Sequence, residues 1–174
     1  NEATKNKIYN TMELIEGGDK KSLRDVRGAA EQMLEGMKLS LRRLKAEPDS
    51  YFHESDLLES GVVNDIIENL KQSKLCGEEN GAHYLDLGAE GIAGRNQNFF
   101  FTRKNGLSLY TTRDIAYHLD KFTRCDKALN ILGEDHRLQG KLLGIALREL
   151  KSKEPRNLFY SFVNLPGTCL SNQT

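Results

Sequence analysis

The stretch that decides the fold is S-L-Y-T-T-R-D-I-A-Y-H, residues 108–118, which lies where a predicted strand passes into a predicted helix. Tyr110 and Asp114 are four residues apart in it, so in a helix their side chains face the same side. A second polar cluster, G-E-D-H-R-L-Q at 133–139, follows the next predicted strand. Two clusters at successive strand-to-helix turns share one edge of a parallel sheet, and open α/β sheets bind ligands at that edge.

The spacing of apolar residues changes along the chain and predicts two parts. Up to about residue 72 the apolar residues recur at steps of three and four, which predicts helices over 22–44 and 62–70. Beyond about residue 81 strands alternate with helices, which indicates parallel β-α-β units. The expected strands are 82–87, 98–102, 107–110, 128–132 and 158–163, and the expected helices are 112–124 and 135–151.

Asn105-Gly106 predicts a β-hairpin that joins the strands 98–102 and 107–110. An Asn-Gly pair suits a type I′ turn, because that turn needs positive φ at both central residues. Tyr110 would then be the last residue of a strand, at the edge of a sheet.

The composition fits a globular chain and argues against several classes of protein. The 174 residues include 25 Lys+Arg and 25 Asp+Glu, so the formal net charge is zero, whereas a dedicated nucleic-acid-binding module usually has a basic excess. No apolar run approaches the ~20 residues of a membrane helix. The three cysteines are far apart and predict neither a metal site nor a disulfide framework. We therefore expect a cytoplasmic protein with no membrane partner and no protein-bound metal.

Together with F-Y-S-F-V-N-L-P at 159–166, the two motifs resemble arginyl-tRNA synthetase, a class I aminoacyl-tRNA synthetase. The resemblance implies a mixed α/β fold, with a helical insertion at 1–80. The second half of a Rossmann-like nucleotide-binding fold, with a parallel sheet and an added β-hairpin, would follow at 81–174. The implied reaction is ligation of arginine to tRNA(Arg) through an arginyl-adenylate, with ATP as substrate and Mg²⁺ accompanying the ATP.

The resemblance assigns arginine binding to Tyr110, Asp114 and Gln139. Arginine carries a planar fork of N–H donors that stays charged, so its recognition needs a carboxylate that accepts two of them, and Asp114 could supply it. The alternative is that Asp114 only complements the positive N-terminal end of its helix and that Tyr110 is a sheet residue.

The resemblance assigns ATP binding to Gly133, Asp135 and His136. A glycine directly after a strand lets a ligand approach the backbone closely. Asp135, at a helix start, could accept hydrogen bonds from ribose hydroxyls, and the alternative is that it caps the helix.

The chain departs from the family pattern in two places. The HIGH-type motif of the family does not occur in it, and the tail 167–174 has no Lys or Arg where relatives carry a loop of the KMSKS class, whose cations steady the triphosphate. We therefore expect the parent enzyme to be active and the isolated chain to be inactive. The alternative is a non-catalytic synthetase-related module that keeps an arginine pocket. Self-association is also conceivable, because half of a doubly wound sheet has an open edge.

Overall fold

The computed structural model describes residues 1–92, 94, 97–150 and 158–163, and the chain divides into two compact units, Asn1–Val63 and Asn64–Thr174. Each unit is described by itself. The division into a helical insertion at 1–80 and the second half of a nucleotide-binding fold at 81–174 stays a prediction.

The first unit is helical, as the apolar spacing predicts. The long helix α2 begins at the N-cap Asp19, whose carboxylate accepts a hydrogen bond of 2.8 Å from the backbone N–H of Ser22. This bond satisfies one of the free donors of the first turn. None of the α2 residues is buried, so its apolar stripe lies largely on the surface. The helices of this unit are α1 (Glu2–Glu16), α2 (Lys20–Arg43) and α3 (Glu54–Glu59).

The second unit contains an antiparallel sheet of strand order β1-β2-β3, preceded by helix α4 (Val62–Lys71) at the unit boundary. Its strands are β1 (Cys76–Glu79), β2 (Ala82–Asp86) and β3 (Asn98–Phe100). The strand β1 was not expected from the sequence. Asn80 and Gly81 join it to β2 with φ values of 51° and 83°, and Glu79 pairs with Ala82. The type I′ signature of an Asn-Gly pair is therefore realised at this turn.

The expected hairpin at Asn105-Gly106 is only partly formed, and the prediction of a strand over 107–110 is wrong. Thr102 and Ser108 form a single antiparallel bridge, and Gly106 has φ 81° whereas Asn105 has no positive φ. The chain therefore makes a turn followed by a left-handed glycine, an alternative hairpin connection. Tyr110 is then the first residue of helix α5 (Tyr110–Arg124).

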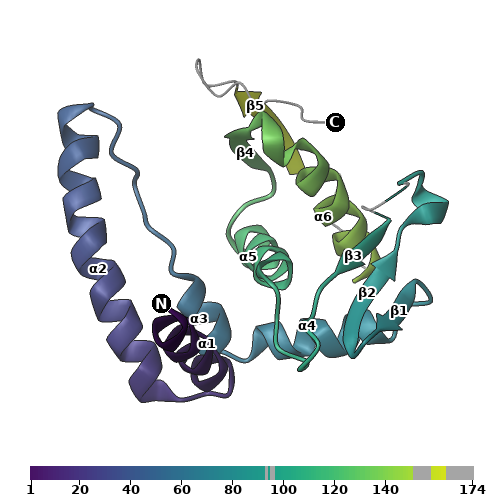
Figure 1. The fold of residues 1–174 in the computed structure, drawn as a ribbon. Helices are drawn as coiled ribbons and strands as arrows, with labels where there is room; N and C mark the ends of the chain where they lie inside the picture. The colour runs from purple at the N-terminus through teal and green to yellow at the C-terminus, as the bar shows by residue number, and fades with distance from the viewer. Residues whose placement is uncertain (93, 95–96, 151–157, 164–174) are drawn as a thin grey trace. The chain divides into compact units, whose positions relative to one another are not determined.

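The parallel β-α-β unit is present as predicted. Strands β4 (Ala128–Gly133) and β5 (Leu158–Val163) pair in parallel from Ala128↔Leu158 to Gly133↔Val163. Between them in the chain lie the 3₁₀ turn η3 (Glu134–His136) and helix α6 (Arg137–Glu149), which lies beside the strand pair (Figure 1). The mixed α/β fold class is thereby confirmed.

The β4–β5 pair has one covered face and one open face. Burial alternates along β4 and β5, so every second side chain points away from the helices. Parallel strands are usually covered on both faces. The apolar side chains on the open face are Leu129, Ile131, Phe159 and Val163.

Among the residues that the structure describes, none of the helices combines the length and apolar character that crossing a bilayer requires.

Candidate functional site

The N-terminal turns of α5 present Tyr110 and Asp114 from one rigid element. Tyr110 is the first residue of the helix and is 59% exposed, and Asp114 lies one turn further on. The first turn of α5 contains no acidic residue. The effect of the helix dipole falls off within that turn. Complementing the helix terminus is therefore a weak explanation for Asp114.

Two buried threonines anchor this helix start to the last residue of β3 and to the residue after it. The Thr111 hydroxyl donates to the carbonyl oxygen of Phe100 at 2.9 Å, and the Thr112 hydroxyl donates to that of Phe101 at 2.5 Å. These bonds explain why the chain turns into a helix at Tyr110 instead of continuing the hairpin. They also fix the direction in which the side chains of the helix start point.

Gln139, on α6, meets Tyr110 across 29 residues of sequence. The Tyr110 hydroxyl lies 3.5 Å from Gln139 Oε1, which makes a long and weak hydrogen bond. Gln139 Nε2 is buried and has no hydrogen-bond partner among the described residues. A buried amide donor without a partner costs free energy, so this atom is a candidate contact for a ligand or for another part of the protein.

Tyr160, on β5, is a residue of this region that sequence reasoning missed. Its ring packs against Gly140 of α6, where an added Cβ would lie 3.0 Å from Cε1 of the ring. Its hydroxyl is buried and makes no hydrogen bond of normal geometry to the described residues. The Asn130 side chain acts to lower the pKa of Tyr160, but two larger effects raise it. Burial, followed by the negative charge of Asp114, raises the pKa of Tyr160 to about 12. A neutral hydroxyl therefore lies near the predicted arginine-binding carboxylate.

The expected ATP residues lie together at the end of β4. The Asp135 carboxylate lies against the backbone of Gly133, where an added Cβ would be 2.4 Å from Oδ1 and would displace this exposed side chain. His136 Nε2 lies 3.7 Å from Asp135 Oδ2, and the two side chains are 54% and 60% exposed. Asp135 is the N-cap of neither η3 nor α6, so the alternative role as a helix cap is not what the structure shows.

Within the described residues, no hydrogen bond or ion pair links Asp135 or His136 to Tyr110, Asp114 or Gln139. By their described contacts, the predicted arginine residues Tyr110, Asp114 and Gln139 are one group and the predicted ATP residues Gly133, Asp135 and His136 are a second group. Arg137 follows the second group directly in the sequence. Its Nε lies 2.5 Å from Glu134 Oε1, and its Cζ lies 4.4 Å from the centre of the Phe162 ring. This ion pair lowers the pKa of Glu134 and raises that of Arg137.

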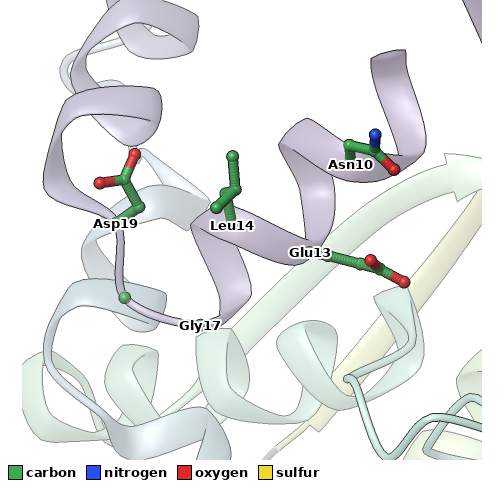
Figure 2. Close-up of a pocket in the computed structure, with 6 residues that line it drawn as sticks. Asn10, Glu13, Leu14, Gly17 and Asp19 are labelled. Carbon is green, nitrogen blue, oxygen red and sulfur yellow. The ribbon is translucent and has the colours of Figure 1, made fainter. Parts of the chain in front are cut away.

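A hollow in the first unit, at the corner between α1 and α2, contains none of the predicted residues (Figure 2). Its lining includes Asp19, whose carboxylate already caps α2. The hydrogen bonds from Ser22 lower the pKa of Asp19. Across residues 1–92, 94, 97–150 and 158–163, no three His, Cys, Asp or Glu side chains are grouped so that they could hold a metal ion.

Comparison with known proteins identifies relatives over nearly the whole chain. The chain is 40% identical over 173 residues to the arginine–tRNA ligase of Methanocella arvoryzae. This alignment covers 99% of the chain and 30% of the relative. The chain is also 39% identical over 146 residues to the arginine–tRNA ligase of Methanocaldococcus jannaschii. That alignment covers 83% of the chain and 25% of the relative. No family model matches the chain.

Solved structures show the same fold. A Campylobacter jejuni protein assigned as an arginyl-tRNA synthetase matches 80% of this chain and 30% of its own, with a TM-score of 0.68 and 28% identity. The arginyl-tRNA synthetase of Thermus thermophilus matches 82% of this chain and 31% of its own, with a TM-score of 0.67 and 17% identity, a likeness of fold alone. The chain spans about 30% of the length of these proteins. The resemblance that the motifs carry is thus confirmed, and the chain corresponds to a segment of the arginyl-tRNA synthetases.

Proposed function

We propose that this chain supplies the arginine pocket of an enzyme that ligates arginine to tRNA(Arg) through an arginyl-adenylate. The observation that carries the proposal is the contact of Tyr110 with Gln139, because Tyr110 lies one helical turn before Asp114 on α5 and the motifs single out all three residues. Because the relatives are about three times as long as this chain, the ligase activity belongs to the proposal as well.

Asp114 is the group of this pocket that suits a guanidinium best. Its side chain is 33% exposed, so a ligand can reach one of its oxygens, while the other contacts His118. A carboxylate in such a partly buried position binds a charged N–H donor more strongly than one in water. Tyr110 and Gln139 then supply a ring face and an amide on either side.

Gly133, Asp135 and His136 are the residues that we assign to ATP. The exposed Asp135 carboxylate, which lies against the backbone of Gly133, suits hydrogen bonds from the ribose hydroxyls of a nucleotide. Mg²⁺ would be bound by the phosphate oxygens of the ATP, since the described residues offer no cluster of ligands for it.

A second candidate is a synthetase-related module that binds arginine without activating it. It is favoured by the tail 167–174, which has no Lys or Arg. Both candidates require the arginine pocket, and they differ in the use of ATP.

The test of the pocket is an NMR titration of the ¹⁵N-labelled 174-residue chain with arginine, citrulline and lysine. Citrulline has the length of arginine but no charge, and lysine has the charge without the planar fork. We expect saturable shifts of the Tyr110, Asp114 and Gln139 signals with arginine and much smaller shifts with the other two. The signals of the α1–α2 corner serve as the internal control. Equal responses to arginine and citrulline would contradict the assignment of Asp114.

A further inference from the structure

We propose that His118 is a positioning residue for arginine recognition, because Asn130 and Lys121 hold it in the tautomer that donates a hydrogen bond to Asp114. This inference rests on the proposed function, since it concerns the orientation of the carboxylate that we assign to arginine. His118 lies one helical turn after Asp114 on α5 and is buried.

The proton on His118 is located by its contact with the backbone. His118 Nδ1 lies 2.8 Å from the carbonyl oxygen of Asp114 and 3.2 Å from Asp114 Oδ1. A carbonyl oxygen only accepts hydrogen bonds, so Nδ1 must carry the proton and donate. The same N–H is directed at the carboxylate, and it therefore restrains the rotation of the Asp114 side chain.

The opposite edge of the imidazole ring has a partner that keeps it unprotonated. His118 Nε2 lies 2.7 Å from Asn130 Nδ2, which is a donor, so Nε2 accepts. The orientation of the Asn130 amide is itself fixed, because Lys121 Nζ lies 2.7 Å from Asn130 Oδ1 and an ammonium group can only donate. If the amide were turned over, its N–H₂ group would face the ammonium.

Lys121 is held at this end of the chain of hydrogen bonds by several contacts. Its Nζ lies 4.2 Å from the centre of the Tyr117 ring and 3.5 Å from His118 Nε2. Burial lowers the pKa of Lys121, whereas the negative charge of Asp114 acts in the opposite direction. The series of hydrogen bonds therefore runs from Lys121 through Asn130 and His118 to Asp114. Asn130 lies on β4 and the other three residues lie on α5.

The consequence for a ligand concerns direction. Because Nε2 accepts from Asn130, the ring directs its Nδ1–H group at the Asp114 carboxylate. With Oδ1 held by His118, Oδ2 remains the free oxygen of a side chain that is 33% exposed.

A matched pair of substitutions separates positioning from packing. The amide nitrogen of asparagine lies about where Nδ1 of histidine lies, whereas the amide of glutamine reaches the position of Nε2, where its oxygen accepts from Asn130 as the ring nitrogen does. His118→Asn therefore keeps a donor for Asp114, whereas His118→Gln keeps only the contact with Asn130. Ile115→Val is the control for packing, because Ile115 is fully buried in the same helix. This substitution removes one methyl group from the core and changes no polar contact.

The experiment measures the arginine affinity of the 174-residue chain by NMR titration, together with the ¹⁵N signals of the His118 ring between pH 6.5 and 8. We expect wild-type His118 to show a protonated Nδ1 and an unprotonated Nε2. His118→Gln should weaken arginine binding roughly tenfold, whereas His118→Asn and Ile115→Val should stay within about threefold of the wild type. A tenfold loss corresponds to about 1.4 kcal/mol.

A second variant tests the tautomer without changing the histidine. Asn130→Asp places a carboxylate at Nε2, which should protonate this nitrogen as well, produce an imidazolium beside Asp114 and weaken arginine binding. A wild-type ring protonated at Nε2 would overturn the inference, and so would equal affinities of His118→Asn and His118→Gln in a chain that binds arginine. A wild-type chain without any arginine response would instead overturn the proposed function.

Discussion

Asp114→Asn is the substitution that tests the charge of the proposed pocket most directly. Asparagine keeps the shape of the side chain, and its Oδ1 can still accept from His118, which lies 3.2 Å from Asp114 Oδ1 in the wild type. Only the negative charge and one strong acceptor are lost. The affinity for arginine should therefore fall without a change of fold.

The size of the effect follows from the exposure of the side chain. Breaking a fully buried charge pair on one side typically costs ~3–5 kcal/mol. A hydrogen bond to a charged group is worth about 1.5–3 kcal/mol. Because the Asp114 side chain is 33% exposed, solvent screens the pair and the lower range applies, about 1.5–3 kcal/mol. At 1.4 kcal/mol per decade this is a loss of roughly 10- to 150-fold in arginine affinity.

The assay is a titration of wild-type and Asp114→Asn chains with arginine and with citrulline. The wild type should prefer arginine, and the variant should bind both ligands about equally, because it no longer distinguishes the charge. ATP binding should change little, since Asp135 and His136 belong to the other group of residues. An Asp114→Asn chain with the arginine affinity and selectivity of the wild type would refute the assignment of Asp114.

Further predictions concern the glycine of the β4 turn, the buried tyrosine and the activity of the chain. Gly133→Ala should change the free energy of unfolding by no more than about 0.5 kcal/mol, because the φ of −64° at Gly133 suits alanine and only the exposed Asp135 carboxylate, 2.4 Å from the added Cβ, has to move. Gly144→Ala, in α6 with no heavy atom within 4 Å of the added Cβ, should raise it by roughly 0.5–1 kcal/mol, and urea unfolding measures both. The folded-state pKa of Tyr160 is about 12 and its ordinary value is 10, so its contribution to stability is complete below pH 10 and is lost as the pH rises from about 10 to 12. Tyr160→Phe should make the decline of stability over that range shallower, and an unchanged slope would show that the tyrosine does not titrate differently in the folded state. The purified 174-residue chain should show no arginine-dependent ATP–pyrophosphate exchange above a control without arginine, because its sequence has no HIGH-type motif and no basic tail loop.

Several elements follow from local sequence because the signal for each lies within a few residues. The apolar spacing predicts α2 and α4, and the alternation of strands and helices predicts the parallel β4–β5 pair. The motifs at 108–118 and 133–139 predict the family and the two turns that carry the candidate site residues. The roles assigned to Tyr110, Asp114 and Gln139 remain predictions for the experiments above.

The errors occur where tertiary contacts overrule a local preference. Asn105-Gly106 carries the same dipeptide signal as Asn80-Gly81, but only the second pair forms a type I′ turn. At the first pair the hydroxyls of Thr111 and Thr112 bind carbonyl groups at the end of β3 and so stabilise a helix that begins at Tyr110. The sequence offers no local reason to prefer one of these outcomes to the other.

By itself the sequence predicts the resemblance to arginyl-tRNA synthetases, most of the helices and strands, and the residues at the two strand-to-helix turns. Only the tertiary structure brings Asn130 to His118, twelve residues away, and places Tyr160 near Asp114. The physical reason is that hydrogen bonds and charge interactions between separate elements depend on the register of β4 against β5 and on the packing of α5 and α6 beside them. Periodicity along the chain shows which face of each element is covered, but it does not show which residues meet there.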